Sequence, residues 1–312
     1  MRRRDFVAGL ATSALAAWMA SAQTNPRRPR LLIANSDPFT GLPLLKTRYA
    51  AGLRLLGDME GLALSWQLTR QESFAESASA QMRKTHLASR GKPTRSWVDY
   101  ARWALAFDWL FDYRGFDRGL KNRVATELRD GAAAVLSTRD FADPGQFSYH
   151  NYAPRCLVPA ALAASALEGY PNCDEQCRSW RDTIGKCFAN VLQVSDVVSP
   201  EGSYHESLDY MRITWASLVL ISELQRTTMG VDPAHHFSMF RNIGNTYLYK
   251  LLPDGTPSRE GDNEYPVLDS RDTALLGYAV NRFKDPYSAW LLRKERILCQ
   301  AMGAATSGIS LG

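Results

Sequence analysis

Residues Trp97–Phe111 read WVDYARWALAFDWLF, and this stretch predicts a helix that is buried on nearly every side. Its apolar and aromatic residues occupy positions all around a helical projection, which is typical of a helix enclosed by other helices. Asp117–Leu136 differs, because Leu120, Val124 and Leu128 lie on one apolar stripe and charged residues lie off it. That second pattern predicts a helix with one face in water.

The same alternation continues along the chain. The strongly apolar segments are Cys156–Leu167, Tyr210–Leu224 and Thr273–Phe283, and the mixed or amphipathic ones are Trp180–Val194, Ala234–Leu251 and Ala289–Cys299. Alternating apolar and polar residues, which would indicate strands, are almost absent from the sequence. We therefore predict an all-α fold in which helical hairpins form two layers, with the buried helices on the inside.

Composition limits the classes of partner. The chain has 312 residues, of which 45% are hydrophobic, with 8 Trp, so it can bury a sizeable core. The formal net charge is +5, and no dense basic patch of the kind used for nucleic acid is present. The mild positive charge is compatible with an anionic ligand, and nucleic acid is not expected as a partner.

The N-terminus predicts an export signal over residues 1–22. Arg2–Arg4 form a charged region, Phe6–Ala20 an apolar region, and Ala20–Ala22 a small-residue cleavage site. Arg3–Val7 fits the core of a twin-arginine signal, with ordinary secretion or a membrane anchor as alternatives. A basic linker follows at residues 23–30, then the main domain at 31–300 and a tail at 301–312. We expect a periplasmic or secreted protein that is not membrane-bound after signal cleavage.

Cysteine and histidine spacings do not indicate a metal site. The five cysteines stand at positions 156, 173, 177, 187 and 299. Cys173 and Cys177 are close enough to form a disulfide, or they are small apolar core residues. No CxxC pair is present, and His235 with His236 lacks a third ligand at metal spacing. The sequence therefore predicts neither a metal nor a cofactor.

Four segments of the chain resemble the heparinase II/III-like polysaccharide lyases and their alginate-lyase relatives. They are Arg28–Ile33, ALAFDWL at Ala104–Leu110, PEGSYHESLDY at Pro200–Tyr210, and the loop of Asp254–Pro257 with Gly261 and Asp262. Their order and spacing are more specific than any one motif, and the resemblance covers about residues 28–295. It implies an incomplete (α/α) toroid of helical hairpins, in agreement with the two-layer array. In that family a β-sandwich follows the toroid, and we expect this chain to lack it.

Lyases of this family cleave a 4-linked uronic acid by β-elimination, which needs a base, an acid and a group that neutralises the carboxylate. The resemblance implies that Tyr210 is the acid, with a second role as base, and that Tyr204 is its rival. It also implies that His150 is the base or the carboxylate-side partner and that Asn151 is the neutralising amide. The alternatives are a His-Asn pair that caps the next helix and tyrosines that are packed aromatics.

Further residues near these motifs are candidates for binding the sugar. Glu206 matches the family's acidic position and is expected to fix the loop or a sugar hydroxyl, while His205 is expected to be exposed or to face the substrate. Arg155 and Arg212 fit a uronate carboxylate or a sulfate through paired donors, and the alternative is that they are surface charges. The chain departs from the family pattern at Met211, where the family has Trp, and at Ser207-Leu208, where it has Gly-Pro.

The sequence thus predicts a secreted polysaccharide lyase whose partner is an acidic polysaccharide with uronic-acid residues. One alternative is a glycoside hydrolase on the same toroid, for which Glu206 and Asp262 are the available carboxylate pair. The other is a protein that binds glycans without catalysis, or a truncated lyase fragment. The sequence does not choose among glycans.

Overall fold

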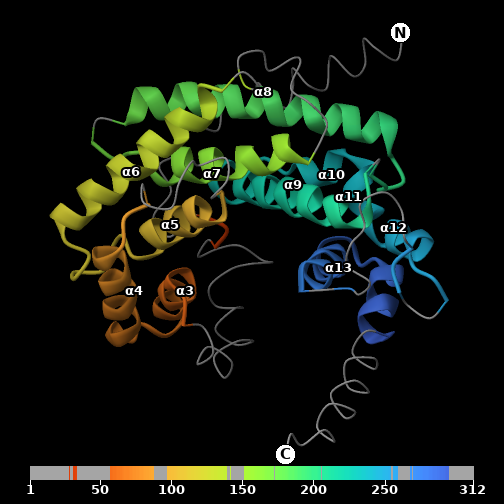
Figure 1. Cartoon of the computed structure of the whole chain (residues 1–312), viewed down its shortest axis with the longest axis horizontal. Coiled ribbons are helices and arrows are strands. Elements are labelled where there is room, and N and C mark those ends of the chain that lie inside the picture. The colour runs from red at the N-terminus through yellow and green to blue at the C-terminus, as the bar shows by residue number, and fades with distance from the viewer. Residues whose placement is uncertain are drawn as a thin grey trace, which may run out of the picture. The chain divides into compact units, whose positions relative to one another are not determined.

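The computed structural model describes residues 28, 31–33, 57–87, 97–138, 141, 151–171, 173–204, 206–253, 256–258, 268 and 270–294. Within these segments the chain is mostly helical (Figure 1), and the β-type pairing that they contain is an isolated bridge between Leu251 and Pro257. The predicted all-α class is confirmed. The chain divides into two compact units, residues 1–193 with 217–233 and residues 194–216 with 234–312.

The first unit is built from helices that pack around α5 and α7. Its helices are α3 (Met59–Thr69), α4 (Glu72–Lys84), α5 (Trp97–Trp109), α6 (Arg118–Leu136), α7 (Tyr152–Ala166), the larger part of α8 (Asp174–Val198) and the second half of α9 (Leu208–Met229). Helix α5 packs against α3, α6 and α7, and α6 also packs against α7. These two central helices therefore carry the core of the unit.

Helix α7 is enclosed on all sides, as its sequence predicts. From Ala153 to Ala166 every residue except Arg155 is buried. Many of these side chains are alanines, whose small size lets neighbouring helices approach closely. Helix α6 shows the predicted single stripe, because Leu120, Val124 and Leu128 are buried while the charged residues between them are more exposed.

An N-terminal segment is fixed to this core by buried polar contacts. Asp108 on α5 accepts a hydrogen bond from Arg28 Nη1 at 2.8 Å and another from the Leu31 amide at 3.0 Å. Arg28 Nη2 also donates to the carbonyls of Ala166 and Glu168 at 2.6 and 3.2 Å, at the C-terminal end of α7. A guanidinium is favourable there because the last carbonyls of a helix lack intrahelical donors and carry partial negative charge.

The second unit contains short helices packed around α13. It holds residues 194–198 of α8 and 208–216 of α9, followed by α10 (Pro233–His236), α11 (Ser238–Arg241), α12 (Ile243–Lys250), α13 (Ser270–Phe283) and a helix at residues 286–294. Helices α11, α12 and α13 pack against one another. The rings of Trp215 and Phe240 pack edge to face with centroids 5.7 Å apart, and both buried side chains contribute to this small core.

The stretch Ala234–Leu251, which we expected to be a single mixed element, is three short helices. Phe237 has an extended backbone, with φ −112° and ψ 124°, and this separates α10 from α11. Asn242 has φ −103° and ψ 11° and separates α11 from α12. Asp196 stabilises the start of α11, because its carboxylate accepts hydrogen bonds from the Ser238 hydroxyl at 2.7 Å and the Met239 amide at 3.1 Å.

Candidate functional site

The loop that precedes α9 is held in a fixed shape by its glycine. Gly202 has a φ of +87°, which side-chain-bearing residues rarely adopt. A Cβ at this position would lie 2.6 Å from the carbonyl oxygen of Asn242, so the backbones approach too closely for any other residue. Asn242 Nδ2 donates to the Pro200 carbonyl at 2.8 Å. The Pro200–Gly202 turn is therefore clamped against the start of α12.

The two tyrosines considered for catalysis have different environments. Tyr204 follows the clamped turn and is buried. Tyr210 lies in the first turn of α9 and is half-buried, as is Glu206 in the loop before it. A group that exchanges a proton with a sugar must be reachable from solvent. Of the two tyrosines, Tyr210 meets this condition in the structure.

Arg212, in the same helix, lies in a buried cluster of charges. Its side chain is 0% exposed, with Nη1 3.4 Å from an oxygen of Asp209 and Nε 3.3 Å from an oxygen of Asp272. The Tyr247 hydroxyl donates to the same Asp272 oxygen at 2.7 Å. Because a buried charge needs a partner of opposite charge, this cluster joins α9, α12 and α13. The geometry gives Arg212 a role in positioning α9, and its binding of substrate stays a prediction.

Asn151 and Arg155 belong to the first unit, at the start of α7. Asn151 is buried and stands at the N-cap position, but its side chain makes no capping hydrogen bond to α7. The capping interpretation therefore gains no support. Arg155 places its guanidinium 3.8 Å from the centroid of the Tyr152 ring, and Tyr152 is 55% exposed. The first turn of α7 thus presents a stacked cation and aromatic ring beside Asn151.

Of the candidate catalytic and binding residues, three lie outside the described residues. They are His150, His205 and Asp262. Tyr204, Glu206, Tyr210 and Arg212 belong to the second unit, and Asn151 and Arg155 belong to the first.

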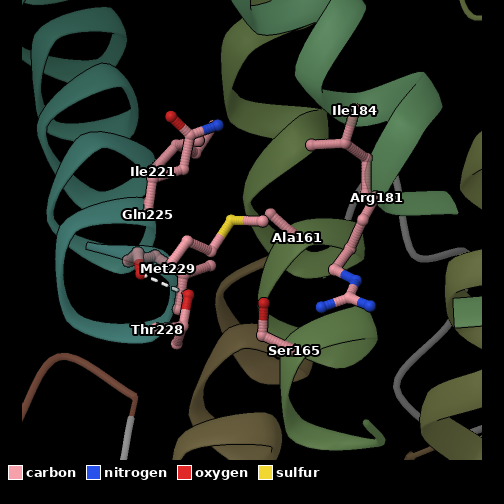
Figure 2. A pocket seen from close by; sticks show the side chains of 9 residues that line it. Ala161, Ser165, Arg181, Ile184, Ile221, Gln225, Thr228 and Met229 are labelled. Carbon is pink, nitrogen blue, oxygen red and sulfur yellow. Dashed lines mark hydrogen bonds between the residues drawn. The ribbon is translucent and has the colours of Figure 1, made fainter. Parts of the chain in front are cut away.

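A cavity in the first unit is too small for a sugar. It lies between α7, α8 and the second half of α9, and Figure 2 shows Met229 and Thr228 on one side and Ala161 and Ser165 on the other. Its volume is about 20 Å³, which is room for roughly one water molecule. Arg181 borders it and pairs with Glu168 at 2.5 Å. We interpret this cavity as a packing gap beside a structural ion pair.

The sequence predictions did not include the carboxylate partners of Arg212 or the aromatic ring that stacks on Arg155. A signal for the first was available, because Arg212 is a charged residue at the start of the strongly apolar segment Tyr210–Leu224 and needs a carboxylate when that segment is buried. Asp272, in the first turn of α13, supplies that carboxylate. No signal of this kind marked Tyr152, whose importance depends on its exposure.

No protein-family model matches the chain, and no curated protein matches it in sequence. The family resemblance therefore stays a prediction that rests on the four motifs. In the segments that the structure describes, no three His, Cys, Asp or Glu side chains gather as a metal ion would require. None of the described helices is long and apolar enough to cross a membrane.

Proposed function

We propose that this protein is a secreted polysaccharide lyase that cleaves glycans containing uronic acid by β-elimination, on an incomplete (α/α) toroid. The observation that carries the proposal is the local structure of Pro200–Tyr210. A glycine-dependent turn is clamped to α12, and the half-buried Tyr210 follows it in the first turn of α9, a helix that the buried pair of Arg212 and Asp272 ties to α13. This places a candidate acid on a rigid support, as catalysis requires.

The proposed reaction needs no water and no cofactor. The C5–H bond of the uronate breaks, a C4–C5 double bond forms, and the bond from C4 to the glycosidic oxygen breaks. His150 takes the C5 proton, and Tyr210 gives a proton to the departing oxygen. Asn151 donates a hydrogen bond to the uronate carboxylate, which stabilises the negative charge that develops when the proton leaves.

The test follows the new double bond, which absorbs near 232 nm (about the value for unsaturated uronates formed by elimination). The full chain is incubated with alginate, heparan sulfate and hyaluronan. Absorbance should rise with at least one of them, and Tyr210→Phe should reduce the rate about 100-fold or more, the usual contribution of a general acid or base.

Tyr204→Phe is the matched control, because it removes the same atom from a buried ring. Its folded fraction should keep the parent rate. Full activity in Tyr210→Phe would overturn the assignment of the acid. New reducing ends without absorbance would turn the proposal to a glycoside hydrolase.

A further inference from the structure

Arg155 is the single charged side chain of α7. The helix contains no carboxylate from Tyr152 to Ala166, and Arg155 is its fourth residue, so the positive charge lies in the first turn. The N-terminal end of a helix itself carries partial positive charge. A cation at this end is therefore unfavourable unless an anion lies close to it.

The described part of the chain does not supply that anion. Arg155 forms no ion pair with a carboxylate there, and its Nε is buried without a hydrogen-bond partner among the described residues. The residues that come directly before the helix, Ser148–Asn151, contain no carboxylate in their sequence. Because a buried donor without an acceptor is costly, the guanidinium is suited to an anionic ligand.

The ring of Tyr152 holds this guanidinium. The Arg155 Cζ atom lies 3.8 Å from the ring centroid, closer than the 4.0 Å between Arg28 Cζ and the Phe111 ring. A planar guanidinium that stacks on a ring does so with its face, and its N–H groups point outward from its edge. Stacking on Tyr152 therefore leaves Arg155 able to bind a carboxylate in the plane of the guanidinium.

Asn151, Tyr152 and Arg155 share one side of the start of α7. Asn151 has helical dihedral angles, φ −58° and ψ −29°, so Arg155 stands at i+4 from Asn151 and at i+3 from Tyr152. Residues at these spacings are neighbours on a helix surface. Asn151 is the amide that the proposed function assigns to the uronate carboxylate. Arg155 thus lies on the face where that carboxylate would bind.

We propose that Tyr152 is a positioning residue for Arg155, and that Arg155, held on the Tyr152 ring, binds the carboxylate of a uronate together with Asn151. The choice of a uronate as the anion rests on the proposed function. A guanidinium donates two parallel, charge-assisted hydrogen bonds to a carboxylate, so this contact favours an acidic sugar over its neutral counterpart. The ring restricts the long side chain of Arg155 before the ligand arrives, which reduces the entropy lost on binding.

The test compares an acidic glycan with its carboxyl-reduced form, in which each uronate has become a neutral sugar. Calorimetry measures the binding of alginate, heparan sulfate and hyaluronan to the full chain carrying Tyr210→Phe, and the polymer that binds most tightly is then reduced. Arg155→Ala should raise Kd for the acidic polymer about 10-fold, the loss expected for one charge-assisted contact. It should leave Kd for the reduced polymer unchanged.

Three further variants isolate the ring. Tyr152→Ala should raise Kd for the acidic polymer about 3-fold or more, and Tyr152→Phe, which keeps the ring, should retain the parent Kd. Tyr152→Ala combined with Arg155→Ala should bind no more weakly than Arg155→Ala alone, because the ring acts through the guanidinium.

Arg70→Ala is the matched control. Arg70 lies over the Trp66 ring at 5.1 Å, in the same unit but on α3 and its C-cap. Its replacement removes a similar cation–aromatic pair and should leave Kd unchanged for both polymers. Circular dichroism should show that every variant is folded.

Three results would overturn the role of Tyr152. The first is a Tyr152→Ala protein with the parent Kd. The second is an equal loss with the acidic and the reduced polymer, which would show that the ring contacts the sugar directly. The third is a parent chain that binds none of the three polymers.

The proposed function is judged separately, by the absorbance of the elimination product. Binding that depends on Tyr152 and Arg155 in a chain without lyase activity would sustain the positioning role and reject the lyase. Lyase activity in the parent, with unchanged binding in Tyr152→Ala, would reject the positioning role alone.

Discussion

Asp108 accepts hydrogen bonds from both a side chain and a backbone amide of the N-terminal segment. It belongs to the ALAFDWL motif, which was noted for its resemblance to a motif of polysaccharide lyases. Its carboxylate meets Arg28 and the Leu31 amide, while the indole nitrogen of Trp109 donates to the Leu31 carbonyl at 3.0 Å. At this position the ALAFDWL motif is therefore explained by packing. Catalysis is not needed to account for these two residues.

Replacing Asp108 should show the size of this contribution. Asp108→Ala leaves the Arg28 guanidinium, whose side chain is 10% exposed, without its carboxylate. We expect the free energy of unfolding to fall by about 3 kcal/mol, as when one partner of a buried ion pair is removed. Urea denaturation measures it. Asp130→Ala is the control, since Asp130 is 64% exposed and should change stability by less than about 0.5 kcal/mol. Equal effects of the two variants would contradict the prediction.

A pair of tyrosines tests the buried charge cluster in the second unit. The Tyr247 hydroxyl donates to Asp272, whereas Tyr249, two residues later on α12, is largely exposed. Tyr247→Phe should reduce the free energy of unfolding by about 2 kcal/mol, the usual contribution of a hydrogen bond to a buried charge. Tyr249→Phe should leave the denaturation midpoint where it is. A Tyr247→Phe protein as stable as the parent would show that Asp272 does not depend on this donor.

At the scale of elements, the start of α9 is set by the loop before it. The turn at Gly202 combines a left-handed backbone with a close approach to Asn242, so it determines how the chain enters α9 and where Tyr210 lies. Helix α6 in the first unit begins with a side-chain cap instead, because Asp117 accepts from the Leu120 amide at 2.9 Å. The start of α9 should therefore be sensitive to replacement of Gly202, and the start of α6 to replacement of Asp117.

Gly202→Ala and Gly230→Ala form a matched pair for the loop. Both glycines have positive φ, at 87° and 70°, but of these two only Gly202 has a backbone atom within contact distance of a new Cβ. Gly230→Ala should cost about 1 kcal/mol from backbone strain alone. Gly202→Ala should cost about 1–3 kcal/mol and also lower the proposed lyase activity, because the loop must move. If the two variants had equal stability and equal activity, the close approach would have no consequence.

The cap of α6 gives a dependence on pH. The Leu120 amide, followed by Arg83, lowers the pKa of Asp117 below its ordinary value of 3.8. A carboxylate with a lowered folded-state pKa contributes stability that is present above 3.8 and is lost as pH falls through the folded pKa. The stability difference between the parent and Asp117→Ala should therefore be present at neutral pH and shrink in strong acid. Urea titrations across that range measure it, and a difference that grew toward acid would contradict the assignment.

At the scale of the whole molecule, the apolar patterns predicted the helical class and the contrast between α6 and α7. They did so because burial on one face or on all faces leaves a direct periodic trace in sequence. The breaks at Phe237 and Asn242 left no such trace, since neither residue is a glycine or a proline. The pattern indicated that Arg212 needs a carboxylate, but it did not identify Asp272, which lies 60 positions further along the chain and meets Arg212 through tertiary packing.

For the segment Pro200–Tyr210, the structure bears on the local backbone and on burial, and the catalytic roles stay predictions. The motif located the segment Pro200–Tyr210, and its glycine is the residue that the turn requires. Which tyrosine is accessible depends on how the loop lies against α12, and the sequence alone gave no measure of that. The roles of His150 and Tyr210 in catalysis stay predictions. The absorbance assay at about 232 nm, where an unsaturated uronate absorbs, tests them.

The contact between Arg28 and the end of α7 has a consequence for the order of events during synthesis. The guanidinium binds the Ala166 carbonyl, which lies 138 residues further along the chain. A ribosome makes the chain from its N-terminus, so Arg28 leaves the exit tunnel long before its acceptor exists. The same segment can already meet Asp108 and Trp109 on α5 before α7 has been translated. Its contact with the end of α7 is therefore the last of these contacts to become possible.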